Sequence, residues 1–138
     1  MTLQDLVRDP DALWTREPPA EPAVLAALAA ALPALPADYL AFLALSGGGE
    51  GDLGADPGWF ALWPAGEVAA LHVQYEIPTY LPGYTGFGSN GGGELLAFAP
   101  DGRVVAVPFI PMDSAEAVEI APRFTDLVRL FGRGAPAT

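Results

Sequence analysis

The sequence predicts a single α+β domain in which helices pack on a twisted antiparallel sheet. The chain has 138 residues, a length typical of one domain. The expected elements run helix, helix, strands and final helix, without the regular strand–helix alternation of a parallel sheet. Two apolar runs joined by Pro100-Asp101-Gly102 also have the form of a β-hairpin. We therefore expect one domain over 1–138, with its core over about 22–131.

The first 20 residues are predicted to be an extended N-terminal segment. A short helix is expected around Leu3 to Val7. Pro10, Pro18 and Pro19 follow it, and proline disfavours continued helix. The segment is therefore expected to lie across the surface of the domain.

Two helices are predicted next, and together they form a helical hairpin. The first spans Pro22 to Leu32, where proline fits the first turn and apolar residues recur at spacings of three and four: Val24, Leu25, Leu28 and Leu32. The second begins near Pro36, places Tyr39, Phe42 and Leu43 on one face, and ends at Gly47 to Gly49.

The middle of the chain is predicted to alternate loops with short elements. Glu50 to Gly58 is interpreted as an acidic, glycine-rich loop, and the aromatic run Trp59 to Trp63 as a strand. Gly66 to His72 is expected to form one or two helical turns. A short strand is expected around Tyr84 to Gly88.

The last third of the sequence predicts a hairpin, a helix and a tail. The hairpin strands are Leu95 to Ala99 and Arg103 to Pro108. The helix is inferred from apolar residues at helical spacing up to Gly132: Ile120, Phe124, Leu127, Val128 and Phe131. We expect this helix to pack on the sheet and 133–138 to form a loose tail.

The charge of the chain argues against a nucleic acid or membrane partner. There are 17 acidic residues against six basic ones, all arginine, for a formal net charge of −11. Such a field repels phosphate backbones and anionic lipids. It attracts a basic protein surface. Acidity that only keeps an apolar-rich chain soluble is an equally good interpretation.

The composition points to the cytoplasm. Cysteine is absent, so there is no disulfide and no cysteine-based zinc site. The start Met1-Thr2-Leu3-Gln4-Asp5 lacks the features of a signal peptide. The longest apolar run, Ala23 to Leu35, is too short to span a bilayer.

Four segments, in this order, resemble the SMI1/KNR4 family, also called the SUKH superfamily. The first joins Leu35-Pro36-Ala37-Asp38-Tyr39-Leu40-Ala41-Phe42-Leu43 to Ser46-Gly47-Gly48, with Ser46 where many members have Asn. The others are Phe60-Ala61-Leu62-Trp63 with Glu67-Val68, the glycine-rich stretch Phe87 to Phe98, and Ile120 to Leu127.

The resemblance implies a fold with helices against a twisted antiparallel sheet and no catalytic residues. It also implies a protein-binding module. Bacterial members are widely taken as immunity proteins that bind and neutralise a cognate toxin, whereas fungal members regulate cell-wall synthesis. Members of one family can differ in function.

The motifs that could carry chemistry have simpler structural explanations. Gly86 to Gly91 matches G-x-G-x-x-G, but a strand follows it where a dinucleotide site needs a helix, so we interpret it as a turn. His72, the only histidine, is expected at the surface or as a cap. The acids of the Glu50 to Gly58 loop do not match an EF-hand. We predict no catalytic, cofactor-binding or metal-binding residue.

Aromatic and acidic residues near the glycine-rich loops are the predicted partner-binding residues. Exposed Trp and Tyr side chains are favoured interface anchors, and carboxylates suit a basic partner. The predicted set is Glu50, Asp52, Asp56, Trp63, Tyr80, Tyr84, Asn90 and Glu94. For Trp63, burial in the core is an equally good interpretation.

The functional hypothesis is a cytoplasmic immunity protein that occludes a toxin domain with a basic surface. One alternative is a regulatory or scaffolding protein that binds host proteins without any toxin. Another is a small carboxylate-based hydrolase, because 17 acids offer many pairs and no spacing singles one out.

Overall fold

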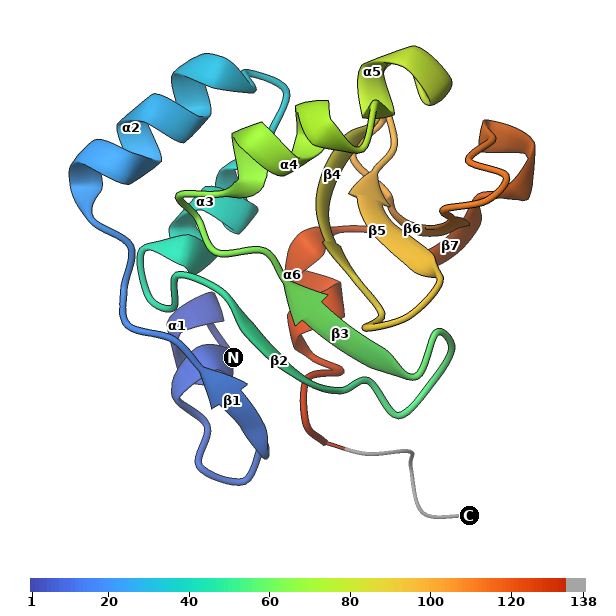
Figure 1. Ribbon diagram of the computed structural model, residues 1–138. Coiled ribbons are helices and arrows are strands. Elements are labelled where there is room, and N and C mark those ends of the chain that lie inside the picture. Colours follow the sequence, from blue (N-terminus) through green and yellow to red (C-terminus); the bar gives the residue numbers. More distant parts are fainter. Residues whose placement is uncertain (134–138) are drawn as a thin grey trace.

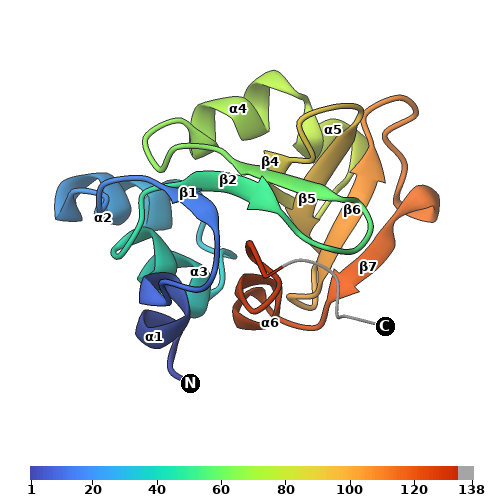
Figure 2. The same ribbon diagram turned by 90° about the horizontal axis from the view of Figure 1, so that it is seen from below.

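The computed structural model describes residues 1–133, which form one seven-stranded antiparallel sheet with helices on both faces (Figures 1 and 2). The α-helices are α1 (Leu3–Arg8), α2 (Pro22–Ala31), α3 (Ala37–Leu43), α4 (Val68–Gln74), α5 (Ile77–Tyr80) and α6 (Phe124–Val128). The strands are β1 (Trp14–Arg16), β2 (Gly49–Asp52), β3 (Trp59–Leu62), β4 (Thr85–Ser89), β5 (Glu94–Phe98), β6 (Val104–Pro108) and β7 (Val118–Ala121), and Ser114–Glu116 forms a short 3-10 helix. The predicted α+β class is confirmed.

The sheet is a meander, in which each strand pairs with the next one along the chain. In Figure 2, α4 and α5 lie on one face of the sheet, and α1, α3 and α6 lie on the other. Helix α2 packs on α3, as the predicted helical hairpin requires, and also on α4. None of the helices in residues 1–133 has the length and apolar character needed to span a bilayer.

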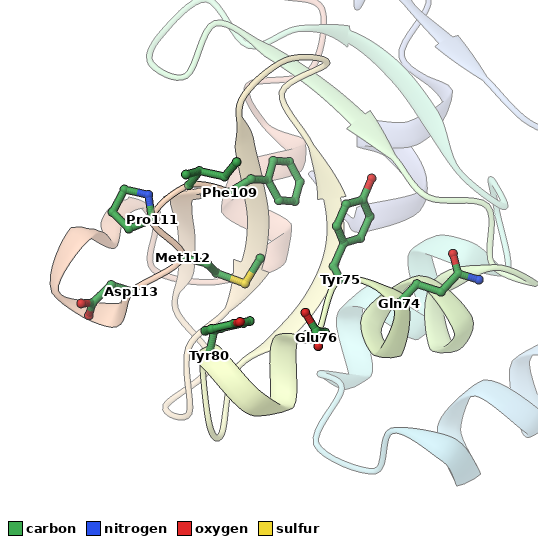
Figure 3. A pocket seen from close by; sticks show the side chains of 9 residues that line it. Gln74, Tyr75, Glu76, Tyr80, Phe109, Pro111, Met112 and Asp113 are labelled. Atoms are coloured by element: carbon green, nitrogen blue, oxygen red, sulfur yellow. The ribbon is translucent and has the colours of Figure 1, made fainter.

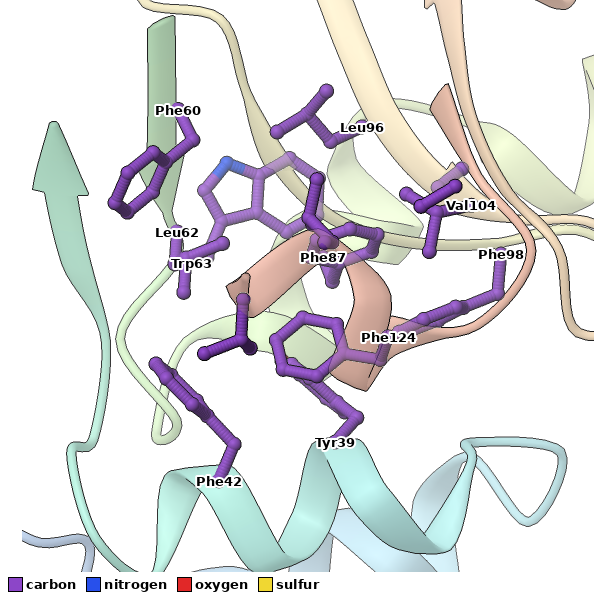
Figure 4. Packing of buried hydrophobic residues seen from close by; sticks show 14 of the residues in the cluster. Tyr39, Phe42, Phe60, Leu62, Trp63, Phe87, Leu96, Phe98, Val104 and Phe124 are labelled. Atoms are coloured by element: carbon purple, nitrogen blue, oxygen red, sulfur yellow. The ribbon is translucent and has the colours of Figure 1, made fainter. Parts of the chain in front are cut away.

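An aromatic core joins α3 and α6 to the sheet (Figure 4). Tyr39 of α3 contacts three rings, with centroids 5.1 Å from Phe124, 5.3 Å from Phe98 and 5.6 Å from Phe87. All four side chains are fully or almost fully buried. Edge-to-face pairs of this kind add stability beyond the area they bury.

Strand β2 is a correction to the predicted Glu50 to Gly58 loop. Gly49 and Gly51 occupy the inward positions of the strand, so no apolar alternation announces it. Trp14 fills the space beside them, since a methyl group on Gly49 would come within 2.6 Å of its ring. Glycine is therefore required because the indole of β1 packs directly on the backbone of β2.

Strand β7 is a correction to the predicted C-terminal helix. Ile120 lies in this strand, and α6 begins only at Phe124. Pro122 separates the two elements and cannot donate a helical hydrogen bond. Helix α6 is anchored to α3, because Asp38 Oδ2 of α3 accepts hydrogen bonds from the backbone N–H (2.9 Å) and the hydroxyl (2.8 Å) of Thr125.

The predicted extended segment 1–20 contains α1 and β1. The helix expected around Leu3 to Val7 is present, but β1 was not predicted. Arg16 ties the segment together, because its guanidinium donates to the carbonyl oxygens of Val7, Asp9, Ala12 and Trp14. Of the predicted tail 133–138, only Arg133 lies within the described residues, and it forms a 2.8 Å ion pair with Asp9.

Gly132 links the C-terminal part of the domain by hydrogen bonds to the N-terminal segment and to β2. Its N–H donates to Asp52 O (2.8 Å) and its carbonyl accepts from Leu13 N–H (2.9 Å). Its φ is +65°, and a Cβ there would lie 2.5 Å from the Leu13 backbone. Neither the conformation nor the space suits any other residue.

We expect Gly132→Ala to destabilise the protein by roughly 3 kcal/mol, because it combines a left-handed backbone with a backbone clash. Gly102→Ala is the matched control, since Gly102 has φ +91° but open space around it. We expect about 1 kcal/mol for the control. Urea unfolding measures both, and equal losses would contradict the role given to the Leu13 contact.

We expect Tyr39→Phe to leave stability unchanged or raise it by up to about 1 kcal/mol. The Tyr39 hydroxyl is buried and has no hydrogen-bond partner among the described residues, and burial raises the pKa of this phenol well above its usual value. Tyr39→Ala should cost about 3 to 5 kcal/mol, because the ring itself fills the core. Chemical denaturation compares the two variants, and a large loss in Tyr39→Phe would show that the hydroxyl has a partner.

Candidate functional site

Three of the eight predicted partner-binding residues line two hollows in the surface: Asp56, Glu94 and Tyr80. The first, called here the acidic pocket, has a volume of about 330 Å³ and is lined by Asp56, Glu94, Val118 and Glu119 among others. The second, called here the aromatic groove, measures about 600 Å³. Its main lining residues are Tyr75, Glu76, Tyr80, Phe109, Met112 and Asp113 (Figure 3).

The acidic pocket brings together two of the predicted carboxylates. Asp56 lies in the exposed β2–β3 loop, and Glu94 begins β5. Neither forms an ion pair with any of the six arginines, all of which lie in the described part of the chain. Trp59, 41% exposed, lies beside Gly91 of the neighbouring β4–β5 turn. Trp59 does not itself line the pocket, which offers negative charge beside the apolar Val118.

Glu50 and Asp52 do not join this pocket. They alternate along β2 with the inward-facing Gly49 and Gly51, and so lie on the opposite face of the sheet from Phe60 and Leu62. The ladder places Leu62, Gly88 and Leu96 side by side, and Glu94 shares the face of Leu96. Asp52 also accepts a 2.7 Å hydrogen bond from Gly54 N–H, which supports its own turn.

Asn90 and Tyr84 have structural contacts of their own. Asn90 Oδ1 accepts hydrogen bonds from the N–H groups of Gly92 and Glu94, both at 3.0 Å, and shapes the β4–β5 turn. Its amide lies 3.4 Å from Glu94 Oε1, which orients that carboxylate toward the turn. Tyr84 is half-buried against the core.

The aromatic groove is built on a stack of three rings. Trp63 is buried, and its ring lies nearly parallel to Tyr75 with centroids 5.6 Å apart. Tyr75 stacks in turn on Phe109 at 4.9 Å. Trp63 is therefore not a surface residue but holds Tyr75 in position.

Tyr80, Glu76 and Asp113 complete the groove. Tyr80 ends α5 and is 54% exposed. Glu76 lies between Tyr75 and Tyr80, and Met112 points toward them from the β6–β7 connection (Figure 3). Tyr80 was predicted as a binding residue, whereas Glu76, Phe109, Met112 and Asp113 were missed. The available signal was the apolar run Phe109-Ile110-Pro111-Met112, which continues past the end of a strand into a loop.

The turn interpretation of Gly86 to Gly91 holds only for the end of the segment, after Ser89. Gly86 and Gly88 lie in β4, Gly91 has φ +77°, and strand β5 follows. A Cβ on Gly88 would come within 2.6 Å of Ala61 O, so the glycine permits the close approach of β3. The phosphate-binding arrangement of strand, loop and helix N-terminus is not present at this segment.

His72 was expected at the surface or as a cap, and its burial shows that the surface position is wrong. The side chain is only 6% exposed, because α4 turns it toward β4. Its Nδ1 accepts a hydrogen bond from Gly86 N–H at 3.3 Å, and burial lowers its pKa. Ser46 is also fully buried, accepting from Glu17 N–H and donating to Gly48 O. Among residues 1–133, no three His, Cys, Asp or Glu side chains gather closely enough to hold a metal ion.

A family model described as the SMI1 / KNR4 family (SUKH-1) matches residues 19–130, which is most of the chain. No curated protein sequence matches the chain. The matched range takes in both hollows and begins just before α2.

We expect stability to fall as the pH drops from about 7 to 5, partly through His72. Its folded pKa lies below the unfolded value, so the unfolded chain binds more protons in this range, and the stability contributed by the neutral ring is lost as pH falls through the unfolded pKa of about 6.5. The slope from one such group is at most about 1.4 kcal/mol per pH unit.

His72→Asn is the test, because its Oδ1 can accept from Gly86 N–H without titrating in this range. We expect urea midpoints between pH 5 and 7 to change less in His72→Asn than in the wild type. An unchanged profile would show that other groups account for the whole dependence.

Proposed function

The chain belongs to the SMI1/KNR4 family (SUKH-1), and we propose that this member is an immunity-type binding protein that occludes a cognate toxin domain with a basic surface. The observation that carries the proposal is the uneven distribution of charge along the chain. No arginine or lysine occurs from residue 17 to 102, although more than half of the 17 acidic residues lie there. This acidic stretch contains all eight residues predicted to bind a partner.

The contacts of the arginines support the same conclusion. Arg103, Arg129 and Arg133 form all the ion pairs found in residues 1–133, and their partners are Asp9, Asp101, Glu119 and Asp126. Asp56 and Glu94 in the acidic pocket and Glu76 and Asp113 in the aromatic groove have no such partner. A field of unpaired carboxylates raises the rate of encounter with a basic protein.

A hydrolase that uses serine or histidine gains no support from the geometry. A serine or histidine mechanism needs a nucleophile and a base in contact at an accessible site. Ser46 and His72 are both buried and occupied by backbone hydrogen bonds. We therefore propose that the protein acts by covering its partner and not by cleaving it.

Affinity capture from lysate of the native cell, at low and moderate salt, tests the proposal. The expected result is one stoichiometric protein with a basic, toxin-like domain that is partly lost as salt rises. Co-expression of that domain with this protein should then restore the growth of a poisoned host. Capture of host regulatory proteins alone, with no protection, would replace the proposal with the scaffolding alternative.

We expect Asp56→Arg to slow association with the captured partner about tenfold at low salt, with a smaller change in the dissociation rate. Glu50→Arg is the matched control, because it changes the charge equally on the opposite face of the sheet. Surface plasmon resonance at two salt concentrations separates the rates. Equal effects of the two variants would mean that net charge matters and the acidic pocket does not.

A further inference from the structure

We propose that the aromatic groove binds an arginine side chain that the partner presents between apolar residues. This inference rests on the proposed function, since it specifies the chemistry by which the partner is held. The partner would thus have a second contact, separate from the acidic pocket, on the face of the sheet covered by α4 and α5.

The aromatic walls of the groove are held in place before any partner arrives. Tyr75 is fixed between Trp63 and Phe109, yet it remains 43% exposed. Tyr80 forms the other wall from the end of α5 (Figure 3). A planar guanidinium stacks favourably on such rings, and walls that need no rearrangement lose little entropy on binding.

Two carboxylates give the groove the charge that a guanidinium requires. Glu76 and Asp113 both line it, and neither forms an ion pair among the described residues. Asp113 Oδ1 also accepts a 2.9 Å hydrogen bond from Ala115 N–H. None of the six arginines of this chain lines the groove. Carboxylates beside apolar walls attract a cation more strongly than carboxylates in open water do.

The backbone at Glu76 is left-handed directly after the end of α4, where glycine is the usual residue. Among residues 1–133, Glu76 is the only non-glycine residue with positive φ, at φ 58° and ψ 33°. Glycine or asparagine would adopt this conformation at lower cost. Strained residues gather at binding sites, and here the strain is compatible with a carboxylate kept at the groove wall.

The rim of the groove is apolar, and it can therefore contact the apolar residues on either side of the partner's arginine. Ile110 is 92% exposed and lines the groove, and Val73 lies exposed one residue before Gln74 of its wall. The volume of about 600 Å³ leaves room for more than one side chain. Exposed apolar residues around a hollow mark interaction sites.

NMR titration of the full chain tests the inference with three capped tripeptides, Ac-Leu-Xaa-Leu-NH₂, in which Xaa is arginine, its neutral isostere citrulline, or lysine. We expect the arginine peptide to shift the amides of Tyr80 and Phe109 and the methyl group of Met112 in a saturable way. The citrulline peptide should bind at least about tenfold more weakly, and the lysine peptide should fall between them.

Variants of the groove separate charge from shape. Glu76→Gln and Asp113→Asn should each weaken the arginine peptide several-fold, and Tyr80→Ala should abolish saturable binding. Glu50→Gln is the control for charge and should change nothing. Glu76→Gly should raise the thermal midpoint while weakening the peptide, because it relieves the backbone and removes the carboxylate.

Equal affinity for arginine and citrulline, tighter binding of lysine, or shifts that map outside the groove would each overturn the inference. Measurements with the captured partner distinguish a failure of this inference from a failure of the proposed function. If Tyr80→Ala binds that partner with unchanged affinity, the protein still binds a partner but not through this groove. If the arginine peptide fills the groove and no toxin is neutralised, the groove stands and the immunity function fails.

Discussion

The packing of Trp14 between distant parts of the chain is the constraint on which the rest of the structure depends. Its ring lies 5.9 Å from Phe42, 5.9 Å from Phe60 and 5.2 Å from Phe131, which come from α3, β3 and the turn after α6. Strand β2 passes beneath it with glycine at both inward positions. The N-terminal segment is therefore part of the core, and the chain closes on itself where Gly132 bonds to Leu13 and Asp52.

The junction of the two chain ends also accounts for the positions of two of the six arginines. Both stabilise this junction. Arg16 donates hydrogen bonds to four carbonyl oxygens of the N-terminal segment, and Arg133 forms an ion pair with Asp9. Arginines bound to backbone and acids near the termini leave the middle of the chain without a compensating cation. The acidic pocket and the aromatic groove both take carboxylates from this middle stretch, and both remain open to a basic partner. Stability and recognition thus use different parts of one small domain.

Most of the helices, the central hairpin and the general site chemistry could be predicted because they depend on local signals. Leu28 in α2 and Phe42 in α3 follow helical spacing, and Asp101-Gly102 is a turn by its own chemistry. Strand β2 could not be predicted, because its buried face is glycine. Strand β7 could not be distinguished from α6 by sequence, because Ile120 fits the helical spacing of α6 as well as the alternation of a strand. His72 shows the same limit, since its burial depends on where α4 meets β4.

The sequence by itself determined the fold class, the family and the acidic, lysine-free surface, because composition, periodicity and turn residues are properties of the chain alone. Only the tertiary structure decided which acids and aromatics meet. It joined Asp56 to Glu94 and separated both from Glu50. It also placed Trp63 beneath Tyr75 and brought Met112 into the same groove as Tyr75. Neighbours across a sheet or between loops depend on strand register and packing, which residue spacing does not encode.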